Sequence, residues 1–171
     1  MFREVELPPG VSGRLFLHSM PGRYEPLDKV WFQVKENRVK AIVCLSDISE
    51  IREKSHAYAS AVESGTVPCA IRPFPVPDYA VPEDREEFWR FAVDVAKQLR
   101  SGDAVLVHCG AGIGRTGTFA TCVLLALGQP MAEATRAVSK AGSHAEVEPQ
   151  KKFILWCASR GKAAEPETGH C

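Results

Sequence analysis

The sequence predicts an α/β fold, in which a central and mainly parallel sheet is flanked by helices. Short apolar runs alternate with longer segments of helical periodicity, which is typical of parallel sheets covered by helices. Residues 104–108 (AVLVH) form an apolar run without polar alternation, as expected for a strand buried on both faces. In such sheets, ligands bind where the ends of strands lead into helices.

The chain has 171 residues, which fits one domain. Hydrophobic residues make up 45% of it and charged residues 25%, as in an ordinary globular protein. We expect one domain over residues 1–160 and a disordered tail over residues 161–171, where the sequence shows no periodicity.

The first half of the chain contains strands and helices in alternation. Short apolar runs predict strands at residues 13–19, 39–45 and 67–74. Apolar residues at helical spacing predict a helix over residues 26–37. A further helix is expected over residues 50–64, which are rich in Ala, Glu and Ser and end at Gly65.

The second half begins with a stiff loop. Four prolines between residues 73 and 82 exclude a helix or a central strand, so a loop is predicted over residues 72–84. An amphipathic helix follows, with Phe88, Ala92 and Leu99 on one face. After the strand at 104–108, apolar periodicity predicts helices at residues 115–128, 130–142 and 148–161.

Charge and cysteine usage exclude several classes of partner. Lys and Arg together number 21, as do Asp and Glu, and this balance argues against a nucleic-acid partner. No apolar run reaches the ~20 residues that span a bilayer, and the N-terminus lacks a signal core, so we expect no membrane partner and a cytoplasmic location. The six cysteines show no CxxC pair and no zinc spacing, so we expect reduced thiols and no metal. We also expect no cofactor and a monomer.

The most informative segment is HCGAGIGRTG at residues 108–117, which joins the apolar strand to a predicted helix. Its glycines permit a backbone that turns successive N–H groups inward, and such a nest binds anions. The helix N-terminus adds a partial positive charge, and the Arg115 guanidinium can grip two phosphate oxygens. Cys109 lies in the same positive field, which favours the thiolate. The segment can therefore form an anion pocket with a nucleophile at its floor.

Two other interpretations of this segment are weaker. A nucleotide loop of the GxxxxGK[ST] type needs a lysine, which is absent, and a dinucleotide loop needs a second strand where two helices are predicted. A glycine-rich turn with a buried cysteine leaves unexplained why Cys109 and Arg115 bracket five residues and are followed by Thr and Gly.

The segment VHCGAGIGRTGTF (107–119) is similar to the active-site loop of the protein tyrosine phosphatase superfamily, His-Cys-x5-Arg-Ser/Thr-Gly. The resemblance implies that Cys109 is the nucleophile and Arg115 the phosphate clamp. It implies that Thr116 assists departure of the thiolate in the second step and that His108 holds and tunes the cysteine. The phosphate would bind to the loop residues Gly110, Ala111, Gly112, Ile113, Gly114 and Arg115. The length of the chain resembles the compact dual-specificity-like branch, whereas the loop interior resembles the tyrosine-specific members.

Cysteine attack on a phosphate ester also needs an acid that protonates the departing oxygen. The proline-rich loop offers Asp78, in the segment VPDYAVP (76–82), which resembles the family's mobile Trp-Pro-Asp loop with a following Gly-Val-Pro. Val76 replaces the Trp and Ala80 replaces the Gly. On its own, Asp78 is equally well explained as a turn former. Beside the Cys-Arg motif, the resemblance implies that it is the general acid.

Three more polar residues are weaker candidates. Glu83 and Asp84 are rival carboxylates, but they suit the start of the next helix better. Residues 146–153 (EVEPQKKF) resemble a late family segment, Gln-x3-Gln-x2-Phe, in which Glu146 takes the place of the first Gln. The resemblance makes Gln150 the candidate that orients the hydrolytic water. The alternative is an exposed polar residue in the first turn of a helix.

Cys44 ends a strand that we expect beside the strand leading to Cys109. Some relatives protect their nucleophile as a disulfide with a second cysteine, which makes Cys44 a candidate redox partner. A buried core thiol is the alternative.

The expected function is that of a cysteine-dependent protein phosphatase with a phosphocysteine intermediate. A phenolate leaves more easily than an alkoxide, and residues 110–114 carry no lysine for additional phosphates, so phosphotyrosine on protein is the favoured substrate. Phosphoserine and phosphothreonine stay open as substrates. The alternatives are a module of the same fold that captures phosphotyrosine without turnover and a phosphatase of a non-protein phosphate monoester.

Overall fold

The computed structural model describes residues 1–163, within which five strands form one sheet in the order β1-β2-β5-β3-β4. The strands are β1 (Arg3–Val5), β2 (Arg14–His18), β3 (Val39–Cys44), β4 (Ala70–Pro73) and β5 (Ala104–His108). β1 is antiparallel to β2, and the other neighbouring pairs are parallel. The predicted α/β fold with a central, mainly parallel sheet is therefore confirmed.

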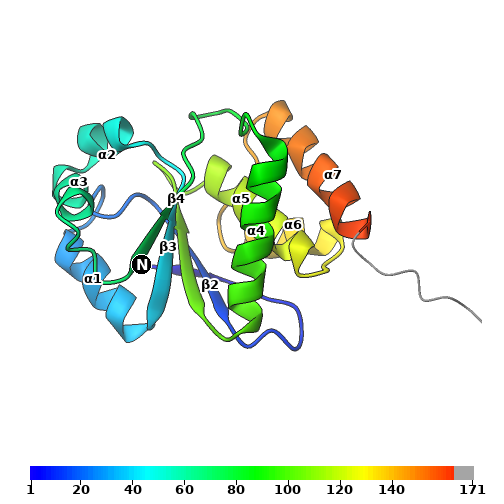
Figure 1. Ribbon diagram of the computed structural model, residues 1–171, viewed down its shortest axis with the longest axis horizontal. Coiled ribbons are helices and arrows are strands. Elements are labelled where there is room, and N and C mark those ends of the chain that lie inside the picture. The colour runs from blue at the N-terminus through cyan, green and yellow to red at the C-terminus, as the bar shows by residue number, and fades with distance from the viewer. Residues whose placement is uncertain (164–171) are drawn as a thin grey trace, which may run out of the picture.

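Helices lie on both sides of this sheet (Figure 1). One side carries α1 (Leu27–Glu36), α2 (Ile48–Lys54) and α3 (His56–Glu63). The other side carries α4 (Arg85–Arg100), α5 (Gly114–Ala126), α6 (Met131–Lys140) and α7 (Glu148–Ala163). α1 and the four helices of the second side coincide with helices predicted from the sequence.

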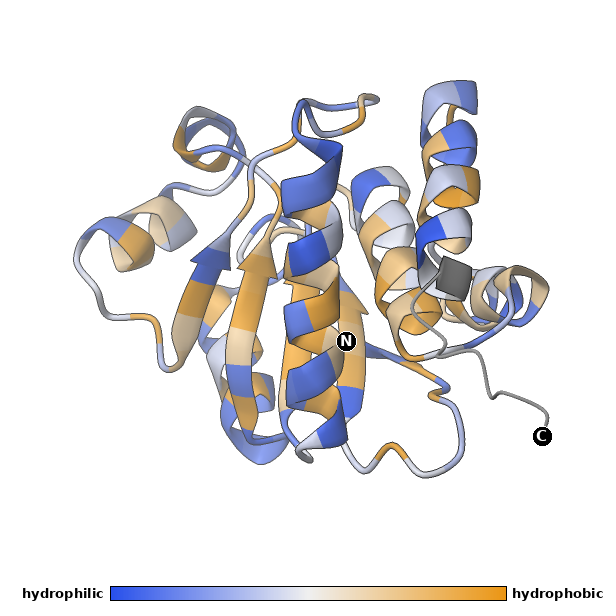
Figure 2. Ribbon diagram, turned by 45° about the vertical axis from the view of Figure 1, so that its right-hand side comes forward, coloured by the Kyte–Doolittle hydropathy of each residue, from blue (hydrophilic) through white to orange (hydrophobic). Residues whose placement is uncertain are grey.

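Alternating side chains of the central strands build a separate core on each face of the sheet. Leu15 and Leu17 of β2 are buried in the larger core, toward α4–α7. Phe16 of β2 and Leu106 of β5 point the other way, into a core with Val34 of α1. Figure 2 shows hydrophobic residues concentrated in the strands and hydrophilic residues on the outward faces of the helices. This burial on both faces explains why the central strand shows no polar alternation.

Two elements differ from the sequence-based expectation. Residues 50–64, predicted as one helix, belong to two, because α2 ends and α3 begins at Ser55. Ser55 has extended backbone, with a φ of −156°, and its Oγ accepts the Tyr58 N–H. Serine favours such a cap, since its side chain replaces a missing intrahelical partner. Strand β1 was not predicted, because its three residues include two charged ones and form no apolar run.

The end of the described chain lies on the second side of the sheet. α7 continues to Ala163, beyond the expected end of the domain at residue 160. The rest of the expected tail, residues 164–171, lies outside the described residues. Within residues 1–163, no helix is both long and apolar enough to cross a membrane.

The carboxyl ends of three parallel strands meet at one edge of the sheet. His18, His108 and Cys44 lie in register at the ends of β2, β5 and β3. Beyond β3, the Leu45 N–H donates to the His108 carbonyl, and the Val76 N–H donates to the Leu45 carbonyl at 3.0 Å. These hydrogen bonds carry the proline-rich loop along the same edge, toward the glycine-rich loop that follows β5.

Candidate active site

The glycine-rich loop connects β5 to α5, and its backbone is held close to the end of β2. Gly112 has a φ of +76°, a left-handed conformation that glycine adopts without strain. A Cβ atom at this position would collide with the His18 carbonyl oxygen. The loop therefore needs glycine here for its conformation and for its approach to β2.

Several carbonyl groups of this loop are bound from outside. The Gly110 carbonyl accepts the Met20 N–H at 3.1 Å, and the Gly112 carbonyl accepts the Ser143 hydroxyl at 2.7 Å. In a trans peptide, the N–H points opposite to the C=O, so the N–H groups of the following residues turn away from these donors. The Gly112 N–H donates to the Cys109 sulfur at 3.3 Å. The loop thus directs N–H groups at the place where the sequence predicts an anion.

Arg115, in the first turn of α5, carries its charge in an almost fully buried position. It forms two parallel hydrogen bonds to Glu50, with Nη1–Oε2 and Nη2–Oε1 distances of 2.8 Å each. Nη1 also donates to the Val76 carbonyl at 3.0 Å. Its Nε is buried without a hydrogen-bond partner among the described residues. A buried donor of this kind is costly unless a ligand accepts from it, so Nε is available to a phosphate oxygen.

Glu50 is the functional residue that the sequence analysis missed. Burial raises the pKa of this carboxyl, but the hydrogen bonds from Arg115 and Lys54 outweigh burial and bring the pKa down to about 2. The Lys54 ammonium lies 2.7 Å from Glu50 on the same helix, α2. The sequence did carry a signal for this site. Glu50 and Lys54 are an acid and a base four residues apart, and they follow the strand predicted at residues 39–45. Glu50 holds the plane of the Arg115 guanidinium by a bidentate pair.

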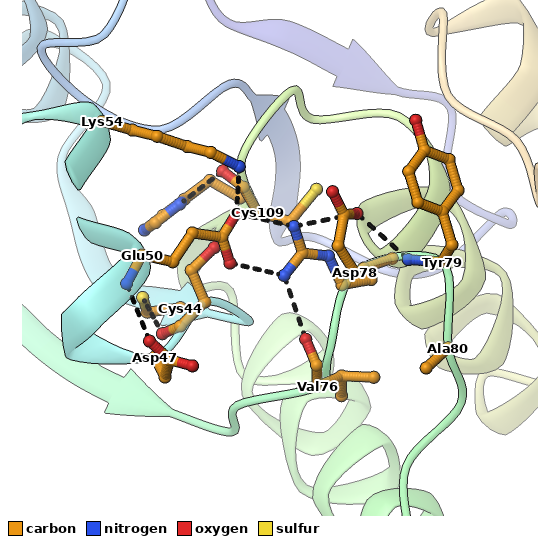
Figure 3. Close-up of polar contacts among 12 residues, drawn as sticks. Cys44, Asp47, Glu50, Lys54, Val76, Asp78, Tyr79, Ala80 and Cys109 are labelled. Carbon is orange, nitrogen blue, oxygen red and sulfur yellow. Dashed lines mark hydrogen bonds and ion pairs between the residues drawn. The ribbon is translucent and has the colours of Figure 1, made fainter.

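Asp78, the candidate general acid, contacts Arg115. Its Oδ1 is 3.1 Å from Nη2 of Arg115, and its side chain is 50% exposed. Figure 3 shows Asp78 on the loop that also carries Tyr79, whose N–H donates to Asp78 Oδ1 at 3.1 Å. The rival carboxylate Asp84 caps α4 instead, accepting the Glu87 N–H at 2.8 Å.

His108 and Thr116 flank the loop at its two ends. His108 is fully buried, with Nε2 at 2.9 Å from the Tyr58 hydroxyl and Nδ1 at 3.1 Å from the Cys109 carbonyl oxygen. Burial lowers the pKa of His108 to about 4, which keeps its imidazole neutral at pH 7. Thr116 Oγ1 is buried and, among the described residues, has no hydrogen-bond partner. Its hydroxyl is therefore free to donate.

Gln150 is buried, so the alternative of an exposed polar residue is wrong. Its Oε1 accepts the Glu146 N–H at 2.8 Å, and its Nε2 donates to the Ala80 carbonyl at 3.4 Å. Gln150 therefore joins the loop that carries Asp78 (the acid-bearing loop, residues 74–84) to the segment before α7. The Glu146 carboxylate lies against the active-site loop, because a Cβ atom at Gly114 would meet its Oε2.

Cys44 ends β3 beside His108, as expected from the sequence. It is buried, and its sulfur lies 3.3 Å from the Ser46 carbonyl oxygen. Burial raises the pKa of Cys44 to about 11, which favours the thiol over the thiolate. Its redox role stays a prediction.

The described part of the chain brings no three His, Cys, Asp or Glu side chains together in a way that could hold a metal ion.

Comparisons with known proteins agree on one family. The model described as "Swiss Army Knife protein, DSP-PTPase phosphatase domain" matches residues 38–168. Tyrosine-protein phosphatase 1 of Caenorhabditis elegans is 32% identical over 124 residues, which cover 51% of this chain and 12% of that protein. Putative tyrosine phosphatase 067L of Invertebrate iridescent virus 3 is 31% identical over 97 residues, which cover 55% of this chain and 38% of that protein. The chain therefore matches well under half the length of these curated relatives.

Solved structures show the same fold at lower identity. Kinase-associated phosphatase, with its catalytic-site cysteine replaced by serine, has a TM-score of 0.79 and 16% identity over 97% of both chains. Tk-PTP in its active form has a TM-score of 0.68 and 24% identity, covering 92% of this chain and 97% of that one. At these identities the likeness concerns the fold alone.

Proposed function

Because this chain belongs to the DSP-PTPase family of dual-specificity and tyrosine phosphatases, we propose that it hydrolyses phosphotyrosine on proteins through a phosphocysteine intermediate. One observation carries the proposal. Asp78 Oδ1 lies 3.1 Å from Nη2 of Arg115, which is in the first turn of the helix that follows the Cys109 loop. This contact joins the candidate acid to the candidate phosphate clamp, six residues after the candidate nucleophile.

In the first step, the Cys109 thiolate attacks phosphorus in line, a sulfur–phosphorus bond forms, and the bond to the tyrosine oxygen breaks. The inward N–H groups and Arg115 stabilise the equatorial phosphate oxygens. Asp78 donates its proton to the departing oxygen.

In the second step, water attacks the phosphocysteine and Asp78 accepts its proton, which releases inorganic phosphate and restores the thiolate. The Thr116 hydroxyl, which has no partner among the described residues, is our candidate for donating to the departing sulfur. Gln150 is our candidate for orienting the water, a role that requires its Nε2 to exchange the Ala80 carbonyl for water.

The choice of phosphotyrosine rests on charge and leaving group. No lysine lies within the loop interior, and the nearby Lys54 is paired with Glu50 at 2.7 Å. A substrate with one phosphate monoester therefore fits the available positive charge. A phenolate, with a pKa of ~10, is also a better leaving group than an alkoxide.

The test is phosphate release from a phosphotyrosine peptide by the wild-type protein and Cys109→Ser. We expect sustained turnover in the wild type and none in C109S, because a serine hydroxyl is not ionised near neutral pH. Phosphoserine and phosphothreonine peptides in the same assay measure the preference for tyrosine. Undiminished turnover by C109S would falsify the mechanism, and a wild-type burst without turnover would identify a capture module.

A further inference from the structure

Arg3, in the short strand β1, lies behind the active-site loop. Its Nη2 donates to the Gly112 carbonyl at 2.6 Å. Its Nη1 donates to the Ala141 carbonyl at 2.9 Å and to the Ser143 hydroxyl oxygen at 3.0 Å. Ser143 in turn donates to the same Gly112 carbonyl at 2.7 Å. One guanidinium thus ties the first strand and the α6–α7 connection to the active-site loop.

The chain leaves room for this side chain. Gly142 has a φ of +81°, and a Cβ atom there would lie 2.9 Å from Nη1 of Arg3. A side chain at position 142 would therefore be strained and would press against the guanidinium. The α6–α7 connection is shaped to receive Arg3.

The contact with the Gly112 carbonyl sets the direction of one amide. Because this carbonyl points toward Arg3, the Ile113 N–H of the same trans peptide points the opposite way. The N–H of Gly112, in the preceding peptide unit, donates to the Cys109 sulfur at 3.3 Å. Arg3 thus binds the peptide unit next to the one that contacts the nucleophile.

The charge of Arg3 is not neutralised by a carboxylate. Within residues 1–163, no salt bridge involves Arg3, whereas Arg115 pairs with Glu50 and Arg14 pairs with Glu4. Burial lowers the pKa of Arg3, and the negative charge of Cys109 opposes this effect. The positive field of Arg3 therefore acts on the active-site loop.

We propose that Arg3 is a positioning residue of the phosphatase reaction. Its charge stabilises the Cys109 thiolate across the Gly112 peptide, and its planar fork keeps the Ile113 N–H directed at the phosphate. This inference rests on the proposed function, because it concerns the same cysteine. Arg3 lies outside residues 38–168, which match the family model.

The experiment measures thiolate formation without turnover. Cys109 is alkylated with iodoacetamide between pH 4 and pH 9, and its modification is followed by mass spectrometry of the peptide that contains it. For Arg3→Gln, we expect the pH midpoint of alkylation to rise by roughly half a unit to one unit, because a nearby positive charge is lost.

Arg14→Gln is the matched control. Arg14 also binds β1, through two hydrogen bonds to Glu4 of 2.8 and 2.9 Å, but on the exposed surface. We expect its alkylation midpoint to equal that of the wild type. A shift in R14Q as large as in R3Q would attribute the effect to loosening of β1 and would overturn the role of Arg3.

Arg3→Lys keeps the positive charge and removes the planar guanidinium, so it tests the two features separately. It also tests the inference if R3Q does not fold. An ammonium keeps the charge but cannot reproduce the planar fork. We expect a midpoint near that of the wild type and a several-fold lower kcat on an aryl phosphate, with a smaller change in KM.

Two further results contradict the inference: an R3Q midpoint equal to that of the wild type, or R3K with an unchanged kcat. Both leave the proposed function standing, because that function depends on C109S.

Discussion

At the scale of single residues, the site is organised around the charge of Arg115. Its two Nη groups are held by Glu50, Val76 and Asp78, while its Nε has no partner among the described residues. Glu50 comes from a different helix than Arg115, so the clamp is rigid only because two distant segments pack together. Asp78, in contrast, is half exposed, which suits a group that has to reach the leaving oxygen. Glu50 therefore fixes the guanidinium of Arg115, whereas the half-exposed Asp78 is our candidate for the acid.

Asp78→Asn tests the role of the acid. Loss of leaving-group protonation should lower kcat by about 10²-fold for a phosphotyrosine peptide or an alkyl phosphate. The loss should be much smaller for an activated aryl ester such as p-nitrophenyl phosphate, whose leaving group needs little protonation. The measurement is the steady-state kcat of both proteins on the two classes of ester. An equal loss of kcat on both classes would show that Asp78 does not protonate the leaving group.

Glu50→Gln tests the support of the phosphate clamp. The amide keeps the shape but loses the charged bidentate pair, so kcat/KM should fall on the order of tenfold. The control is Glu53→Gln, an exposed residue of the same helix, whose kcat/KM should stay at the wild-type value. If both variants behave alike, the pairing of Glu50 with Arg115 has no part in catalysis.

At the scale of elements, the acid-bearing loop is anchored at both ends. Its first part follows the sheet edge through the hydrogen bond from the Val76 N–H to the Leu45 carbonyl. Its last part leads into α4, whose first turn is capped by Asp84. Between these anchors, Gln150 of α7 donates to the Ala80 carbonyl. The loop is therefore anchored at its ends, and its middle is held by the Arg115–Asp78 pair at 3.1 Å and by this long hydrogen bond of 3.4 Å.

Asp84→Ala distinguishes the cap from the acid. Removal of the cap should lower the free energy of unfolding by about 1 kcal/mol, as measured by urea denaturation. The ratio of rates on alkyl and aryl phosphates should not change, since Asp84 does not protonate the leaving group. Glu83→Ala, at an exposed position, serves as the control and should leave stability unchanged. A changed ratio in D84A would reopen the assignment of Asp78.

At the scale of the whole molecule, the sheet order brings chemistry from distant parts of the chain to one edge. β5 lies between β2 and β3, so the loop after β5 is flanked by the ends of both neighbours. The fold lowers the pKa values of two groups near this edge, His108 and Glu50. Burial keeps the pKa of His108 at about 4, and the hydrogen bonds from Arg115 and Lys54 bring that of Glu50 to about 2 against the effect of burial.

Both pKa shifts predict that acid destabilises the fold. Below the ordinary pKa of 6.5, unfolded chains protonate His108 while the folded state does not until about 4, so stability falls over this window. The ionised form of Glu50 stabilises the folded state above pH 4.5. This contribution is lost as the pH falls toward about 2. Urea midpoints should therefore decrease from pH 7 to pH 5 and further to pH 3. Equal midpoints at pH 7 and pH 5 would contradict the neutral state of His108.

Activity has its own pH dependence, set by the two protonation states that the first step requires. The first step needs Cys109 as a thiolate and Asp78 as an acid, so the pH profile of kcat/KM should be bell-shaped. The profile on a phosphotyrosine peptide between pH 4.5 and pH 8 checks this. In Asp78→Asn the alkaline limb should disappear, because no carboxyl remains to lose its proton.

The sequence by itself determined the parts of this protein whose interactions are local. Cys109, the loop amides and Arg115 belong to one loop and one helical turn, so their proximity follows from spacing alone. The alternation of apolar runs and helical periods determined the α/β class. Asp78 was predicted as the acid because its segment resembles the family's Trp-Pro-Asp loop, since without that resemblance a turn former explained it equally well.

Only the tertiary structure decided the contacts made across the sheet. Glu50 is 65 residues from Arg115, Tyr58 is 50 residues from His108, and Arg3 is 109 residues from Gly112. Neither propensity nor periodicity encodes such pairs, because each depends on which strands become neighbours and on the free energy of burying both partners together. The same reason explains why the sequence left open whether Gln150 is exposed, whereas the structure shows it buried and bonded to the Ala80 carbonyl.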